Sequence, residues 1–190
     1  MVDSGQIMVY GIPRLHRRVA QYGIILGDRT TPLAWGSQRR GAIVLSGEYT
    51  HQIDEKARIR IPARLKAALG DGFTCVKGTG GCLCLFPKKY WEENFAAKIM
   101  AVPYSDIEAQ RPIRMFFSSA AELEEDNQGR YLLPRALREY ARIKKDLVFI
   151  GVGMRAEIWA REEYEAYMNG EKREPSPFDK AITGLQKYGV

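Results

Sequence analysis

Two short motifs in the sequence combine a carboxylate and a guanidinium at the same spacing. Asp54 is followed by Arg58, and Asp126 is followed by Arg130, so the motif Asp-X-X-X-Arg occurs twice. An aspartate at the entrance to a turn accepts hydrogen bonds from backbone N–H groups and fixes the shape of the loop. An arginine offers five N–H donors in a rigid fork that suits phosphates and the base edges of the major groove. The pattern therefore indicates two basic loop tips that bind duplex DNA.

An alternative interpretation assigns the same residues a purely structural role. Each arginine could pair with its own aspartate and only pin the turn, and a single motif would favour that interpretation. Two copies with matching flanks favour the DNA-binding surface instead. We expect Asp54 and Asp126 to fix the turns and the DNA contacts to come from Lys56, Arg58, Arg60, Lys66, Gln128, Arg130 and Arg138.

The flanks of the two motifs form an internal repeat, and each copy is predicted to be strand, turn, strand, short helix and hairpin. Residues 58–61 alternate between arginine and isoleucine, which is typical of a half-buried strand. Pro62 suits the start of a helix over residues 63–69, and Gly70 suits its end. Residues 77–81 are rich in glycine and predict a hairpin turn. A unit this small has too little core to fold alone, so we expect the two copies to pack together.

The remaining segments suggest added helices and less regular ends. Residues 88–120 are expected to be helical, with Trp91, Phe95 and Ile99 forming one apolar core stripe. Ser105 with Glu108 predicts a capping box for a second helix, which Pro112 should kink or delay. The predicted organisation is an N-terminal extension (1–43), a first half with connecting helices (44–120), a second half (121–168), and a linker with a short tail (169–190).

Composition and the remaining reactive residues argue against several other classes of protein. The 190 residues carry a net charge of +6, and no stretch is long and apolar enough to cross a bilayer. The odd number of cysteines, three, fits a reducing compartment better than a disulfide framework. Cys82 and Cys84 share one strand face, but no fourth ligand for a metal is evident nearby. Glu122, Glu124 and Glu125 are interpreted as a solvated surface. We expect no catalytic residue, metal or cofactor, although a thiol-dependent enzyme remains an alternative.

Taken together, the motifs resemble the MraZ family, whose halves belong to the AbrB-like swapped-hairpin group. The resemblance covers residues 46–167. It is carried by Gly47-Glu-Tyr49, His51, both Asp-X-X-X-Arg motifs, Ile61-Pro62, Gly80-Gly-Cys-Leu83, Arg114-X-Phe-Phe-Ser118, Ala121-Glu122, Leu133-Pro134, Leu137-Arg138, Ile150-Gly-Val-Gly153 and Glu157-Ile-Trp159.

The resemblance implies both a fold and a function. The implied fold is mixed α+β and rich in strands: a tandem swapped-hairpin β-barrel formed by two pseudo-repeats, with added helices. The implied function is that of a regulator that binds direct repeats in the promoter of a bacterial division and cell-wall gene cluster. Such a protein would form ring-like homo-oligomers in the cytoplasm, associated with the nucleoid, and would have no small-molecule substrate and no membrane partner. The alternative within the same fold group is an antitoxin-like or scaffold protein.

The resemblance also identifies individual residues and departures. It implicates Arg58 in DNA binding, and Lys56 and Arg130 join it by position. The family usually carries glycine where this chain has Ala57. If that position needs a positive φ angle, alanine costs on the order of 1 kcal/mol. Residues 1–43 precede the family-like start, and we expect a disordered extension or one that comes from an upstream start assignment, which intact-mass measurement would test. The functional alternative is a basic arm that contacts the DNA backbone.

Overall fold

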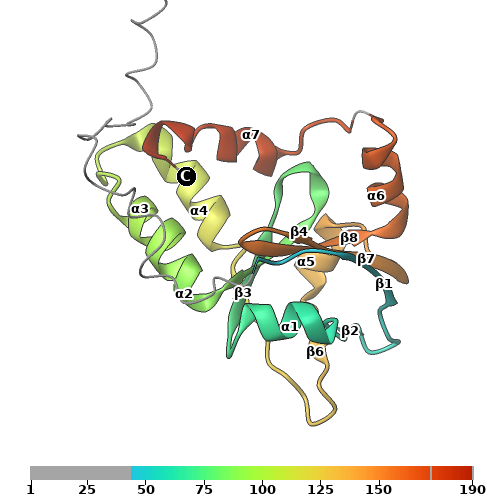
Figure 1. Cartoon of the computed structure of the whole chain (residues 1–190). Helices are drawn as coiled ribbons and strands as arrows, with labels where there is room; N and C mark the ends of the chain where they lie inside the picture. The colour runs from blue at the N-terminus through green and yellow to red at the C-terminus, as the bar shows by residue number, and fades with distance from the viewer. Residues whose placement is uncertain (1–43, 172, 190) are drawn as a thin grey trace, which may run out of the picture. The chain divides into compact units, whose positions relative to one another are not determined.

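Strands from both repeats are combined in one six-stranded antiparallel sheet (Figure 1). The computed structural model describes residues 44–171 and 173–189, so the expectations for residues 1–43 lie outside the described part. The strand order is β1-β7-β8-β4-β3-β5. The strands are β1 (Glu48–Gln52), β3 (Phe73–Lys77), β4 (Leu83–Pro87), β5 (Ala121–Glu122), β7 (Asp146–Val152) and β8 (Arg155–Ala160).

Each repeat completes the hairpin of the other. The β3–β4 hairpin of the first repeat pairs with β5, which belongs to the second repeat. The β7–β8 hairpin of the second repeat pairs with β1, which belongs to the first. This exchange confirms the expectation that the two copies pack together, because neither sheet half is complete on its own.

A second, two-stranded sheet joins the two Asp-X-X-X-Arg motifs. It consists of β2 (Arg58–Ile59) and β6 (Tyr131–Leu132), paired antiparallel. Ile59 lies opposite Tyr131, and these residues occupy equivalent positions in the two repeats. In the large sheet Cys84 lies opposite Glu157, which are also equivalent. Both pairs therefore lie on a local two-fold relation between the repeats.

Short helices follow the strands much as the sequence predicts. The helix α1 spans Ala63–Leu69, as expected, with Pro62 in an extended conformation just before it. Gly70 ends this helix with a φ angle of 78°. The remaining helical segments are α2 (Lys88–Trp91), the π-helical turn η3 (Glu92–Ala96), α3 (Ala97–Met100), α4 (Ile107–Phe117), α5 (Arg135–Tyr140), α6 (Arg161–Met168), α7 (Pro177–Thr183), and the single turns η2 (Thr79–Gly81) and η4 (Gln186–Tyr188).

The start of α4 differs from the sequence-based expectation. The capping residue is Asp106 rather than Ser105, and its carboxylate accepts a hydrogen bond of 3.1 Å from the Ala109 N–H. Pro112 lies inside the helix and does not delay its start at Ile107. Pro112 is buried on the same face as Phe116, so burial of this face offsets the backbone hydrogen bond that proline removes.

Each face of the large sheet carries its own buried core, whereas alternate residues of the edge strand β1 are exposed. On β4, Leu83 and Leu85 belong to one apolar cluster, together with side chains of α1, β2 and β6. Cys82, Cys84 and Phe86 point to the opposite cluster, which α2, α3, α4 and α7 cover. The predicted stripe of Trp91, Phe95 and Ile99 packs in this second cluster, as expected, and so do Phe178 and Leu185 of the C-terminal segment. In the described residues, no helix combines the length and the apolar character that crossing a membrane requires.

Candidate nucleic-acid interface

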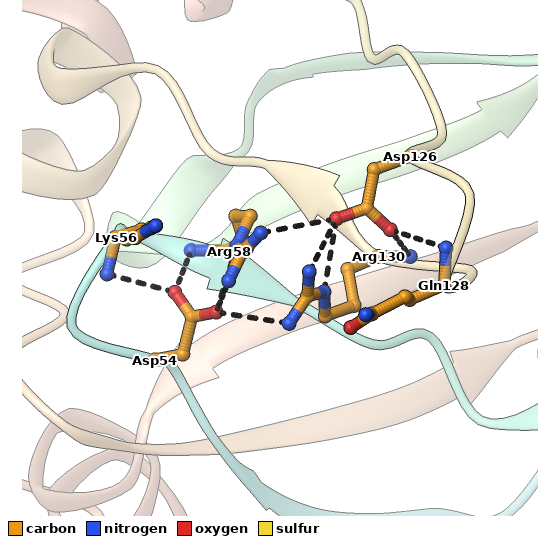
Figure 2. A network of polar contacts seen from close by, with 6 residues as sticks. All are labelled: Asp54, Lys56, Arg58, Asp126, Gln128 and Arg130. Atoms are coloured by element: carbon orange, nitrogen blue, oxygen red, sulfur yellow. Dashed lines mark hydrogen bonds and ion pairs between the residues drawn. The ribbon is translucent and has the colours of Figure 1, made fainter.

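Asp54 organises the first loop tip through its side chain (Figure 2). Its Oδ1 atom accepts hydrogen bonds of 2.9 Å from the backbone N–H groups of Lys56 and Arg58. Its Oδ2 atom accepts a hydrogen bond of 2.8 Å from Nε of Arg58. The backbone closes the same turn, because the Ala57 N–H donates to the Asp54 carbonyl at 2.9 Å. One carboxylate therefore fixes both the loop backbone and the arginine that leaves it.

Asp126 builds the second tip in the same way. Its Oδ1 atom accepts from the backbone N–H groups of Gln128, at 2.9 Å, and Arg130, at 3.0 Å. Its Oδ2 atom accepts from Nε of Arg130 at 2.9 Å. Two loops that share little sequence between their aspartate and arginine thus have matching hydrogen bonds, which indicates that the motif itself determines the loop shape.

The two tips are also joined to each other. Nη1 of Arg58 lies 3.2 Å from Oδ2 of Asp126, and Nη1 of Arg130 lies 3.8 Å from Oδ2 of Asp54. Figure 2 shows the carboxylates and guanidinium groups of these four residues gathered in one cluster, which we call the tip network. It is the pairing of β2 with β6 that brings the two motifs together.

The electrostatics of the tip network follow from its contacts. Hydrogen bonds from Arg130 hold the pKa of Asp126 down at about 2, although partial desolvation opposes the shift. The pKa of Asp54 is also lowered, first by the side-chain hydrogen bond from Arg58 and then by its backbone N–H. Both aspartates are therefore ionised at neutral pH, and their two negative charges balance the two arginines.

The two arginines of the tip network form ion pairs and also remain partly exposed to solvent. The side chains of Arg58 and Arg130 are 23% and 24% exposed. Each arginine pairs with its own aspartate, as the purely structural alternative expected, and also with the aspartate of the other repeat. Each terminal nitrogen of a guanidinium carries two hydrogens. Arg58 and Arg130 therefore keep N–H donors that the ion pairs do not occupy.

The excess positive charge of this surface comes from residues outside the tip network. Lys56 and Arg60 are exposed, and Arg138 is half-buried. Within residues 44–171 and 173–189, these three cations and the exposed Arg64 form no ion pair. Gln128, at the second tip, is exposed as well.

Lys66 differs from its equivalent Arg138. Lys66 forms an ion pair with Glu125, and its Nζ atom lies 5.8 Å from the centre of the Tyr131 ring. The Tyr131 hydroxyl donates a hydrogen bond of 2.8 Å to the same glutamate. Glu125 is exposed, as expected for a solvated surface, and its carboxylate also joins the helix of one repeat to the strand of the other. This contact between the repeats was not predictable from the repeat pattern, since the residue equivalent to Glu125 in the first repeat is Ile53.

The departure at Ala57 coincides with an unusual backbone conformation. Ala57 has a φ angle of 60°, and its equivalent Gly129 has a φ angle of 73°. Both tips therefore use the left-handed region that glycine tolerates and alanine disfavours. The first tip keeps the shape of the second despite its Cβ atom.

Comparison with known proteins places both repeats in one family. A family model described as "MraZ protein, putative antitoxin-like" matches residues 44–113 and again residues 116–185. A protein of Carboxydothermus hydrogenoformans named transcriptional regulator MraZ is 48% identical over 124 residues, which is 65% of this chain and 86% of the relative.

Two other relatives carry the same name. The protein of Heliobacterium modesticaldum is 47% identical over 130 residues, which is 68% of this chain and 89% of the relative. The protein of Syntrophomonas wolfei is 44% identical over 144 residues, which is 76% of this chain and 98% of the relative. The similarity thus covers nearly the full length of these relatives, and the two matches of the family model include both loop tips.

Proposed function

This chain belongs to the MraZ family, and from that premise we propose that it is a transcriptional regulator that binds duplex DNA through its paired loop tips. Its relatives are named as transcriptional regulators, and the family is not one of enzymes. The observation that carries the proposal is the pairing of β2 with β6, which sets two matching basic tips side by side. A rigid projection of two strands is of a size that the major groove admits.

Different residues of the surface have different roles in this proposal. Asp54 and Asp126 are positioning residues that hold the tips in shape. Arg58 and Arg130 donate to DNA through the N–H groups that their ion pairs leave free, and Gln128 reaches base edges. The remaining contacts are to phosphates and come from Lys56, Arg60, Lys66 and Arg138, with Lys66 weakest because Glu125 already pairs with it.

The finer parts of the proposal concern the target and the assembly. We take the target to be direct repeats in the promoter of a bacterial division and cell-wall gene cluster, bound by a ring of identical chains in the cytoplasm, at the nucleoid. A ring makes weak single contacts effective when its spacing matches that of the repeats, because linked sites gain avidity. The two sheets are taken to belong to one closed, swapped-hairpin barrel.

Footprinting on the DNA upstream of the protein's own gene tests the proposal. The expected result is protection of an array of short direct repeats, with an affinity that falls by roughly 0.9 log units per log unit of salt for each neutralised phosphate. Arg60→Ala should lower this salt slope by about one phosphate contact. Lys180→Ala removes an exposed cation of α7, away from the tips, and should leave the slope unchanged. Equal effects of the two substitutions would contradict the assignment of the surface.

A second candidate function follows from the family description, which includes the term antitoxin-like. In that case the chief partner is another protein, and the tips serve as a scaffold. Binding would then depend little on salt and on Arg60, and no ordered footprint would form.

A further inference from the structure

The centre of the large sheet contains four side chains that the proposed function does not use. Cys84 belongs to β4, and Cys82 directly precedes that strand. Arg155 and Glu157 belong to β8. We call these four side chains the central cluster. Cys84 and Glu157 lie directly opposite each other in the ladder between these strands. Where the first repeat has two thiols, the second therefore has an ion pair, and the local two-fold relation brings all four side chains together.

The donor atoms of the central cluster lie at metal-binding distances. The two sulfur atoms are 4.0 Å apart, and both lie within 4.8 Å of a carboxylate oxygen of Glu157. Two thiolates on a tetrahedral zinc ion, each with a bond of about 2.3 Å, lie roughly 3.8 Å apart. The observed distance between the two sulfur atoms thus differs little from the sulfur-to-sulfur distance in such a zinc site. Cys75 takes no part, since it points to the opposite core.

A glycine makes room for the two sulfur atoms. A Cβ atom at Gly78 would overlap the Sγ atoms of both Cys82 and Cys84. The Gly78 carbonyl is held by the Tyr140 hydroxyl, which donates to it at 2.6 Å. The backbone that faces the sulfurs is therefore fixed, and both thiols point into one small space.

The carboxylate of Glu157 is oriented but not saturated. Its Oε1 atom accepts from Nε of Arg155 at 2.8 Å and contacts Nη2 of the same arginine at 2.7 Å. Its Oε2 atom accepts a hydrogen bond of 3.0 Å from Nε1 of Trp159. A carboxylate has about four lone-pair directions, so one remains for a metal ion. Metal-binding carboxylates are usually hydrogen-bonded in this way by a second layer of residues.

Charge and access also suit a divalent cation. Two thiolates and one carboxylate carry three negative charges, and Arg155 with a divalent ion carries three positive charges, so the occupied cluster is neutral. The thiols and Glu157 are buried, whereas the Arg155 side chain is 38% exposed. The buried carboxylate of the cluster is therefore in direct contact with a side chain that reaches solvent.

We propose that Cys82, Cys84 and Glu157 bind a thiophilic divalent cation of the zinc type and thereby tie β4 of the first repeat to β8 of the second. Each thiol loses its proton to solvent as its bond to the metal forms, and no oxidation is involved. Three protein ligands leave the fourth position for water. Metal binding at this site does not depend on DNA binding, so the two proposals are tested independently of each other.

Cobalt(II) is the probe for this site, because it replaces zinc and gives a sulfur-to-metal charge-transfer band in the near ultraviolet. The full chain is first stripped with a chelator and kept reduced, and Co²⁺ is then added. The expected result is one such band that saturates at one ion per chain and disappears when Zn²⁺ is added. The band requires a thiolate bound to the metal, and the chain has three cysteines, so the band reports on these three residues alone.

Variants assign the band to the central cluster. Cys84→Ser should abolish it, and Glu157→Gln should weaken Co²⁺ binding at least tenfold. Cys75→Ser is the matched control, a buried thiol on the other face of the sheet, and should leave the band unchanged. Circular dichroism without metal shows whether each variant is folded.

Three outcomes would overturn the proposal: no band with the folded wild-type chain, a band that survives Cys84→Ser, or a band that Cys75→Ser abolishes. The first would leave Cys82 and Cys84 as a buried S–H···S pair. A second readout is thermal stability, since an ion that binds only the folded chain must raise its melting temperature. Zn²⁺ should raise it for the wild type and for Cys75→Ser, but not for Cys84→Ser.

Discussion

The guanidinium of Arg58 contacts the carboxylate of Asp126 at 3.2 Å, so each repeat braces the loop tip of the other. The same contact explains why the two motifs act as a unit. Each aspartate fixes its own turn through backbone N–H groups, and the arginines connect the two turns. The tips can therefore keep a constant separation while their outer residues contact DNA.

Asp126→Asn tests whether the tip network confers specificity. Asparagine has the size of aspartate but removes the charge that holds both Arg58 and Arg130. The looser arginines, with one more net positive charge, should bind any DNA at least as strongly. The ratio of specific to non-specific affinity should fall roughly tenfold or more, since one well-placed bidentate contact is worth about 1–3 kcal/mol of discrimination.

Competition binding with operator and random DNA at fixed salt measures this ratio. Glu124→Gln removes a charge from an exposed carboxylate near the same loop and serves as the control. If both variants change the ratio equally, net charge and not the network determines specificity.

Acid sensitivity should follow from the lowered pKa of Asp126. The folded pKa of about 2 lies below the ordinary value of 3.8, so the folded state favours the ionised carboxylate. This contribution to stability is present above about pH 4 and is lost as the pH falls toward 2. Melting temperatures measured across that range should therefore decline less steeply for Asp126→Asn than for the wild type. Identical slopes for the two proteins would show that Asp126 does not contribute.

The strained residue at the first tip predicts a stabilising substitution. Ala57 has a φ angle of 60°, and glycine removes the steric cost of that conformation, although it also makes the unfolded chain more flexible. Ala57→Gly should raise the free energy of unfolding by about 0.5–1 kcal/mol. The reciprocal change Gly129→Ala, at a φ angle of 73°, should lower it by a similar amount. Urea denaturation measures both, and a destabilised Ala57→Gly would refute the strain argument.

Local structure was largely predictable from the sequence because it depends on neighbouring residues. The alternation of arginine and isoleucine predicted β2, although the strand ends at Ile59 and not at residue 61. Pro62 with Gly70 predicted the limits of α1. The glycine-rich run predicted the turn between β3 and β4. The predicted capping residue of α4, Ser105, was wrong. Ser105 and Asp106 are adjacent and both residue types can cap a helix, so the sequence alone does not decide between them.

Contacts between the repeats could not be predicted in the same way. Nothing in either motif indicates that Arg58 reaches Asp126, or that Glu125 pairs with Lys66, because both contacts depend on the exchange of strands. The same limit hid the third donor of the central cluster. Glu157 is far from Cys84 in sequence, and only the register of β4 against β8 sets them opposite each other.

The C-terminal helix should be an integral part of the fold. Phe178 of α7 is 3% exposed, and its ring packs against Tyr140 with 5.8 Å between the ring centres. The neighbouring Asp179 accepts a hydrogen bond of 2.9 Å from the Gly80 N–H, which ties α7 to the turn between β3 and β4.

Phe178→Ala should therefore lower the free energy of unfolding by about 3–5 kcal/mol, the range for a buried aromatic side chain. Lys180→Ala, at an exposed position of the same helix, should change it by less than about 0.5 kcal/mol. Urea denaturation of both variants decides the matter, since a loss below about 1 kcal/mol for Phe178→Ala would mean that α7 contributes little to the core.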